Sequence, residues 1–276
     1  MKAVVLTYHS HRMAGADYGA NDHVALAQDL RAIAAAGARI APLHDIARAV
    51  AGNDFAYGMD APVVGISFDD GPRLDVDDFV HPRFGPQRSF ANILRDFAAT
   101  AEGARQERLH ATSFVIASRE ARRAIAGALD IGADAGAWLD DGWWKAAVDE
   151  GLLAVENHSW DHLHDPRYGD AARREDFRDV YRYDEAERQI HRANDAIASV
   201  TGRAPTLFAY PFGRVNDHDY LPGVYFPNRG REIGLTAAFA TGGKAVAVGR
   251  AWAIPRYVCG HHWKNPAGLR AILAAA

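Results

Sequence analysis

The residues best able to do chemistry are carboxylates and histidines in two short segments. Asp69 and Asp70 are neighbours in SFDDGP, and His158 and His162 stand four residues apart in ENHSWDH. Two imidazoles and one carboxylate form a reasonable ligand set for Zn²⁺, with the remaining positions open for water and substrate. Where two carboxylates lie beside one cation, the metal neutralises one and the other stays free as a base. An isolated HxxxH would be interpreted as loop histidines bonded to backbone, but both segments together favour a metal site.

Each segment follows an apolar run that predicts a buried strand. Residues 62–68 (PVVGISF) lead directly into Asp69, and residues 152–157 (LLAVEN) lead into His158. A third run, 205–213 (PTLFAYPFG), also ends in a turn. Loops at the carboxyl ends of parallel strands converge on one mouth, so we expect the three segments to meet there. The motif follows a strand and lacks the glutamate of HExxH, which argues against a helical metalloprotease site.

Strand-like and helix-like runs alternate along the sequence. This alternation predicts an α/β fold with a parallel sheet and crossover helices. No repeat, low-complexity linker or change of composition marks a boundary, so we expect a single domain over residues 1–276. The expected strands are 3–6, 38–43, 62–68, 110–118, 152–157, 205–213, 236–241 and 252–258, and the expected helices are 24–37, 44–52, 89–103, 119–129, 142–151, 175–200, 228–235 and 266–276.

The segment 72–109 is long for a connection between a strand and a helix. Its length predicts an inserted loop and a helix within it. Asp75, Asp77 and Asp78 lie in this segment but lack the glycine and the closing glutamate of a calcium loop. We therefore interpret them as a solvated acidic loop.

Composition excludes several classes of protein. The 276 residues are 49% apolar and carry 31 basic and 35 acidic side chains, a net charge of −4, which argues against nucleic-acid binding as the main function. The single cysteine, Cys259, rules out an intrachain disulfide. No apolar run approaches the ~18–20 residues of a membrane span. The start of the sequence lacks the features of a signal peptide, so we expect a cytoplasmic protein, or a secreted or periplasmic one if a leader has been trimmed.

Five segments in this order resemble the polysaccharide deacetylase family, also called carbohydrate esterase family 4 or the NodB homology domain. The resemblance implies a distorted (β/α)7 barrel and metal-dependent removal of acetyl groups from N-acetylated sugars. The FAYPFG form resembles a subgroup that includes poly-N-acetylglucosamine deacetylases. The segments are YHS (8–10), SFDDG (67–71), ATSF (111–114), NHSWDH (157–162) and FAYPFG (208–213).

The resemblance assigns roles residue by residue. Asp69 matches the catalytic base, and Asp70, His158 and His162 match the metal ligands. The implied cofactor is a divalent metal, zinc first, with cobalt, nickel or manganese as alternatives. Tyr210 is the candidate whose backbone N–H faces the oxyanion, because Pro211 has no N–H to donate.

The sequence departs from the family pattern at two places. Ala209 stands where many members carry an arginine that orients the catalytic aspartate, and Arg256 in IPRY is our candidate replacement. The late leucine-x-histidine motif that supplies the general acid is not evident. In the FAYPFG subgroup the acid is a histidine of the early YH segment, which implies His9, with His261 and His262 as alternatives.

The expected substrate is a small molecule or an oligosaccharide. We expect Trp160, between the expected ligands, to face it. Two other functions fit the same scaffold: hydrolysis of small cyclic amides or imides, and sugar binding without turnover. The intact Asp69, Asp70, His158 and His162 argue against a silent domain, and Ala209 argues for it.

Overall fold

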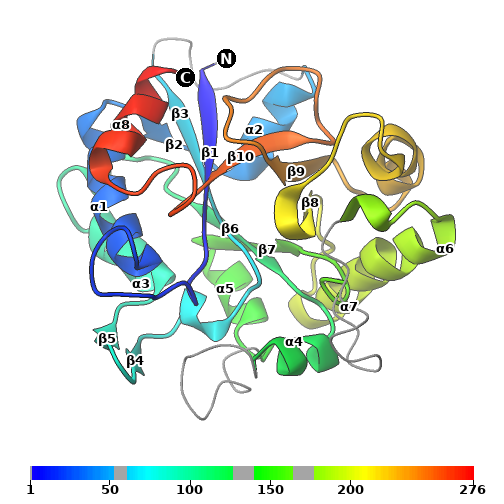
Figure 1. Ribbon diagram of the computed structural model, residues 1–276, viewed down its shortest axis with the longest axis horizontal. Helices are drawn as coiled ribbons and strands as arrows, with labels where there is room; N and C mark the ends of the chain where they lie inside the picture. The colour runs from blue at the N-terminus through cyan, green and yellow to red at the C-terminus, as the bar shows by residue number, and fades with distance from the viewer. Residues whose placement is uncertain (1, 53–60, 127–139, 164–176) are drawn as a thin grey trace.

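The computed structural model describes residues 2–52, 61–126, 140–163 and 177–276. Figure 1 shows strands gathered in the middle of the molecule, with α1, α3 and α8 on one side and α6 and α7 on the other. No helix within these ranges is both long and apolar enough to cross a membrane.

Seven parallel strands close into a barrel. The ring closes where β1 pairs with β3 along its whole length, and a short strand, β2 (Arg39–Ile40), pairs with the other side of β3. This confirms the expected parallel α/β barrel. In ring order the strands are β1 (Ala3–Tyr8), β10 (Ile254–Val258), β9 (Ala237–Thr241), β8 (Leu207–Ala209), β7 (Leu153–Asn157), β6 (Ala111–Val115) and β3 (Val63–Phe68).

Helices cover the outside of the barrel. The largest apolar cluster joins outward-facing strand residues such as Leu6, Ile66 and Val155 to residues of the surrounding helices such as Leu30 and Leu94. Burying this much apolar surface is the main driving force for the fold. The helices are α1 (Asp22–Ala35), α3 (Phe90–Ala98), α4 (Arg119–Ala126), α5 (Trp144–Glu150), α6 (Tyr183–Ala186), α7 (Arg192–Thr201) and α8 (Pro266–Ala274).

A further helix, α2 (Leu43–Val50), closes the amino end of the barrel. Its apolar side chains pack with the first residue of each of five strands, namely Ala3, Val63, Leu207, Ala237 and Ile254. Gly65 makes room for this helix, because a Cβ there would lie 2.4 Å from Leu43 Cδ2. The amino end is therefore filled by side chains, which leaves the carboxyl end for a site.

The segment 72–109 contains the expected loop and helix. A 3₁₀ turn, η1 (Arg73–Asp75), leads to an antiparallel hairpin of β4 (Phe79–His81) and β5 (Gly85–Gln87), and α3 follows. The interpretation of an acidic loop in solvent is wrong for Asp75, which is fully buried. Hydroxyl donors hold it there, as described below.

Two of the expected helices have other first residues than the sequence predicts. The helix expected over 175–200 starts at Tyr183, continues through a π-helical turn, η6 (Glu187–His191), and joins α7; its expected first residues, 175 and 176, lie outside the described ranges. The helix expected over 228–235 starts earlier: a π-helical segment, η8 (Leu221–Gly230), continues into residues 231 and 232, which are also helical. Residues 127–129 of the helix expected over 119–129 also lie outside the described ranges.

Candidate metal-dependent active site

The loops at the carboxyl ends of the strands surround one cavity of about 610 Å³. The loop after β1 contributes His9 and His11, the loop after β3 contributes Asp69 and Asp70, and other loops contribute the remaining walls. The three segments expected to meet are therefore together. The lining residues are His9, His11, Asp69, Asp70, His158, His162, Phe212, Gly213, Arg214, Thr241, Gly242, Val258, His261 and His262.

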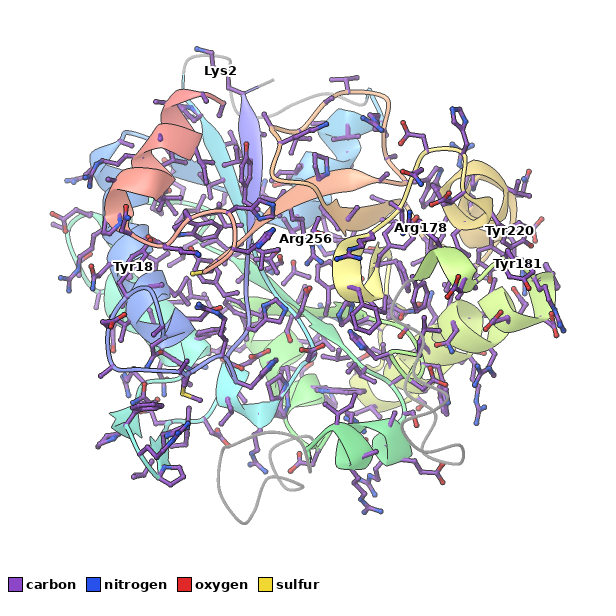
Figure 2. The ribbon with its side chains drawn as sticks, in the orientation of Figure 1. Lys2, Tyr18, Arg178, Tyr181, Tyr220 and Arg256 are labelled. Atoms are coloured by element: carbon purple, nitrogen blue, oxygen red, sulfur yellow. The ribbon has the colours of Figure 1, made fainter. Side chains whose placement is uncertain are left out.

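Asp69 is paired with Arg256. The guanidinium donates from Nη1 to Asp69 Oδ1 at 2.6 Å and from Nη2 to Oδ2 at 2.8 Å, and neither side chain is open to solvent. Arg256 lies near the centre of the molecule in Figure 2. It also stacks over the Phe114 ring, with Cζ 5.4 Å from the ring centroid. The structure thus places Arg256 on the aspartate for which the sequence predicted a partner.

Asp70 points to a different set of partners. Its Oδ1 lies 3.5 Å from Nε2 of His158 and 3.5 Å from Nε2 of His162. These separations exceed a hydrogen bond. They suit ligands of a shared cation, since two ligands ~2.1 Å from a tetrahedral centre lie roughly 3.4 Å apart.

The backbone at Asp70 explains how neighbouring aspartates can have different partners. Asp70 has φ +74°, in the left-handed region that aspartate tolerates better than most residues. Gly71 follows with φ +65°, and a Cβ there would lie 2.4 Å from Val115 Cγ1. The turn therefore ends the strand abruptly and directs the Asp70 carboxylate away from the Asp69–Arg256 pair.

Both histidines are held in place by groups behind them. His158 Nδ1 lies 2.8 Å from the carbonyl oxygen of Ala209, which leaves Nε2 directed at Asp70. The His162 backbone N–H donates to Ser159 Oγ at 2.9 Å, and its ring packs edge-on against Phe212 with centroids 4.6 Å apart. A backbone carbonyl on the far nitrogen is the usual way to fix the orientation of a metal-ligating imidazole.

Electrostatics keeps these groups in the protonation states that a metal requires. Burial lowers the pKa of His162 to about 4, so its ring is neutral near pH 7. Burial alone would raise the pKa of Asp69 and of Asp70. The Arg256 guanidinium outweighs burial at Asp69, and the surrounding imidazoles, His162 first, outweigh it at Asp70, so the pKa of each lies below its usual value.

The donor set fits a divalent cation. One ligand atom each from Asp70, His158 and His162 all lie within 4.8 Å of one another, and the described residues contain no other such group. A carboxylate with two imidazoles, His158 being held through its far nitrogen by the Ala209 carbonyl, is a set that zinc and similar metals bind. Asp69 lies just outside this set, with Oδ2 3.9 Å from His158 Nε2.

The predicted general acid, His9, also faces this cavity. It lines the wall beside Asp69 and Asp70, and its backbone N–H donates to Asp22 Oδ2 at 2.8 Å. His261 and His262 line the same cavity, but Nδ1 of His262 already accepts from the Val258 N–H at 2.8 Å.

The role expected of Tyr210 stays a prediction, and the expectation for Trp160 is wrong. The Tyr210 N–H donates to the carbonyl oxygen of Phe239 at 3.0 Å, as part of the β8–β9 pairing, so it reaches an oxyanion only if that bond is shared or given up. Trp160 does not line the cavity; its ring packs on the outer core, and the Arg192 guanidinium covers it with Cζ 3.7 Å from the centroid.

Sequence reasoning missed two features beside the cavity. His11 reaches Asp70, with Nδ1 3.7 Å from Oδ2. Asp75 accepts hydrogen bonds from Ser10 Oγ at 2.5 Å and Ser113 Oγ at 2.7 Å, and burial raises its pKa to about 7. The available signal was the serine in both YHS and ATSF: Ser10 follows β1, and Ser113 lies within β6.

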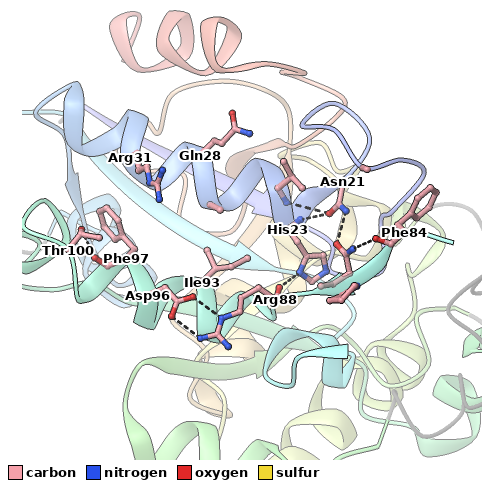
Figure 3. A pocket seen from close by; sticks show the side chains of 15 residues that line it. Asn21, His23, Gln28, Arg31, Phe84, Arg88, Ile93, Asp96, Phe97 and Thr100 are labelled. Carbon is pink, nitrogen blue, oxygen red and sulfur yellow. Dashed lines mark hydrogen bonds and ion pairs between the residues drawn. The ribbon is translucent and has the colours of Figure 1, made fainter. Parts of the chain in front are cut away.

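A second cavity, of about 560 Å³, lies on the outside of the barrel between α1 and α3 (Figure 3). Arg88 crosses its floor and binds Asp96 through two hydrogen bonds, and Phe84 and Phe97 contribute apolar walls. It shares no lining residue with the first cavity.

Three solved structures are similar to this chain over nearly its full length. The deacetylase PplD of Streptococcus pyogenes has a TM-score of 0.63 at 14% identity, covering 99% of this chain and 98% of that one. A de-N-acetylase from Aggregatibacter actinomycetemcomitans has a TM-score of 0.62 at 16% identity, covering 98% and 99%. IcaB from Ammonifex degensii has a TM-score of 0.60 at 20% identity, covering 99% and 95%. At these identities the likeness shows the fold. None of the curated proteins compared matches the chain.

The sequence itself carries the family relationship. The pattern of the polysaccharide deacetylase family matches residues 56–220, which is more than half of the 276-residue chain. This stretch includes Asp69, Asp70, His158 and His162. The chain therefore belongs to the polysaccharide deacetylase family and is a carbohydrate deacetylase, a hydrolase of N-acetyl amide bonds.

Proposed function

We propose that this chain hydrolyses the acetamido group of an N-acetylated sugar, with Asp69 as general base and His9 as general acid. Asp70, His158 and His162 would hold the divalent metal, zinc first. When bound there, such a metal polarises the acetyl carbonyl and lowers the pKa of water toward about 7. All of these side chains line one cavity, so base, acid and metal ligands can face one acetyl group.

Asp69 is built to stay ionised and to face the attacking water. Both of its oxygens accept from Arg256, which fixes the carboxylate plane and keeps the charge on it. An oxygen paired with one guanidinium N–H retains a lone pair that can receive a proton. Asp69 thus takes the proton of the water as the water attacks the carbonyl carbon.

His9 would complete the reaction at the leaving nitrogen. An amine leaves a tetrahedral intermediate readily only when its nitrogen is protonated, so a second group that lines the cavity must supply a proton. His9 comes from the loop after β1, whereas Asp69 comes from the loop after β3. These two strands are neighbours, with Tyr8 opposite Phe68, so His9 and Asp69 follow adjacent strand ends and can face the same acetyl group.

The observation that carries this proposal is the division between the neighbouring aspartates. Asp69 is bound on both oxygens by Arg256, and Asp70 shares one oxygen with two imidazoles. Imide hydrolysis or sugar binding alone gains no specific support from the structure.

Replacing Asp69 by Asn tests the proposal. We expect acetate release from an N-acetylated chitooligosaccharide to fall by about 10²–10⁴-fold, the usual contribution of a general base. Zinc content should stay as in the wild type, because Asp69 lies outside the ligand set. Asp77→Asn, an exposed carboxylate paired with Arg73, is the control and should keep full activity.

Unchanged acetate release in the Asp69 variant would contradict the role of base. Wild-type protein that binds zinc but releases no acetate from any N-acetylated sugar would contradict the proposed reaction. Ring opening of a small cyclic imide by that same preparation would then favour the alternative function, hydrolysis of small cyclic amides or imides.

A further inference from the structure

The two oxygens of Asp70 face different histidines. Oδ1 is directed at Nε2 of His158 and of His162, whereas Oδ2 lies 3.7 Å from Nδ1 of His11. Within the described residues, Nδ1 of His11 is buried and has no hydrogen-bond partner. A buried imidazole nitrogen without a partner is costly, so its approach to the outer oxygen of Asp70 needs an explanation.

The short loop that carries His11 is firmly held. Ser10, between the two cavity histidines, donates to Asp75 Oδ1 at 2.5 Å, and its carbonyl oxygen lies 2.7 Å from Nε2 of His23. The Arg12 N–H closes a turn onto the His9 carbonyl at 2.9 Å. The His11 ring packs edge-on against His9, with centroids 5.7 Å apart. These contacts leave His11 little freedom to turn away from Asp70.

The chemistry of a metal-ligating carboxylate gives this contact a purpose. Such a carboxylate usually receives a hydrogen bond on the oxygen that does not bind the metal, and that bond orients the ligand. An imidazole carries at least one N–H whatever its charge, so the His11 ring can be a donor. In the tautomer with that proton on Nδ1, the N–H points at Oδ2, and closing by roughly half an ångström makes the bond.

His11 is not placed as a fourth ligand. The group whose ligand atoms all lie within 4.8 Å of one another consists of Asp70, His158 and His162 and does not include His11. Its Nδ1 approaches the face of Asp70 that the other two imidazoles leave free.

We propose that His11 is a positioning residue: it donates from Nδ1 to the outer oxygen of Asp70 and so keeps Oδ1 directed at the site shared with His158 and His162. This inference rests on the proposed function, since it requires that these residues hold a divalent cation. It adds to that function a residue that sets the affinity of the site and the geometry of the bound ion.

Two substitutions of His11 separate this role from a structural one. The amide nitrogen of Asn occupies about the place of Nδ1, whereas that of Gln occupies about the place of Nε2. Co²⁺ affinity is measured by competition with a chelator, and the visible absorption spectrum of the cobalt protein reports the coordination geometry. His11→Asn should bind within about three-fold of the wild type, and His11→Gln about 10–100-fold more weakly, with a changed spectrum.

Control measurements make the outcome decisive. His218→Gln removes an exposed imidazole and should leave both affinity and spectrum unchanged. Thermal unfolding of the metal-free variants checks the fold, and His11→Ala replaces the Gln variant, with the same expectation, if that variant does not fold. Equal affinity and equal spectra for the Asn and Gln variants would overturn the inference. So would loss of acetate release in the Gln variant with unchanged cobalt binding, because His11 would then act on the substrate. Wild-type protein that binds no cobalt would overturn the proposed function as well, which distinguishes the two failures.

Discussion

The two ends of the barrel both contain a carboxylate near histidine, but they differ in how the carboxylate is bonded. At the α2 end, Glu156 accepts from His44 Nε2 at 3.0 Å and from the backbone N–H groups of Thr206 at 2.8 Å and Leu207 at 2.7 Å. At the carboxyl end, Asp70 faces three imidazole nitrogens at 3.5–3.7 Å. Both oxygens of Glu156 accept hydrogen bonds from the protein. The imidazole nitrogens around Asp70 lie too far away for a hydrogen bond.

This difference separates a structural carboxylate, Glu156, from the proposed metal ligand, Asp70. The bonds of Glu156 fasten β7 to the start of β8 and to α2, so they contribute to folding. The Asp70 group is incomplete as a hydrogen-bond network, and the cation proposed for this site would complete it. A carboxylate beside a histidine can therefore serve either role. The distance between the carboxylate oxygen and the imidazole nitrogen distinguishes the two roles better than the residue types do.

The largest effect on stability is expected at Arg256, which binds both oxygens of Asp69 at the carboxyl end of the barrel. Arg256→Ala leaves the buried Asp69 carboxylate without its guanidinium, and such a loss typically costs about 3–5 kcal/mol of the free energy of unfolding. Arg256→Lys keeps the charge but not the two parallel hydrogen bonds, so it should cost less. Urea unfolding of the metal-free proteins measures both. An Ala variant as stable as the wild type would show that the pair does not hold the barrel together.

A pair of substitutions of similar size tests the comparison itself. Glu156→Leu removes the oxygen that accepts from the backbone N–H groups of Thr206 and Leu207, which should cost about 1–3 kcal/mol of the free energy of unfolding without changing zinc content. Asp70→Asn should do the reverse: zinc is lost, and the stability of the metal-free protein changes by less than about 1 kcal/mol, since Asn tolerates the left-handed backbone at this position. Retained zinc in the Asp70 variant would contradict the comparison.

A smaller, pH-dependent effect is expected at Asp75. Because burial raises its pKa to about 7, the folded state favours the protonated form. That stabilisation is complete below the usual pKa of 3.8 and is lost as the pH rises through about 7. Asp75→Asn, which stays neutral, should therefore gain in stability relative to the wild type between pH 5 and pH 8. Urea unfolding with a chelator present checks this, and a difference that does not change with pH would exclude a raised pKa.

Much of the site could be predicted from the sequence because strand ends are easy to recognise. The apolar runs before Asp69 and His158 indicate parallel strands, and parallel strands bring their carboxyl ends together whatever their separation along the chain. Arg256 could be suggested for the same reason, as a charged residue in a late strand of the barrel. The barrel confirms that reasoning about the fold.

The remaining features depend on contacts that spacing does not encode. Whether the Tyr210 N–H is free depends on the register of β8 against β9, and Trp160 faces outward because the backbone turns between the two histidines. Asp75 resembles a solvent-exposed acid in the sequence, and only the hydroxyl groups of Ser10 and Ser113 make its burial possible. His11 lies outside the YHS segment that carries the family resemblance, and its proximity to Asp70 arises only in the folded chain.

The most direct test is a crystal structure of the zinc-soaked protein with anomalous data collected at the zinc edge. We expect one strong peak about 2.0–2.2 Å from an Asp70 oxygen and from Nε2 of His158 and His162, with Asp69 still bonded to Arg256 and off the ion. A zinc ion bound by Asp69 would contradict the account. So would the absence of a peak between Asp70, His158 and His162 in a crystal that binds zinc at other positions.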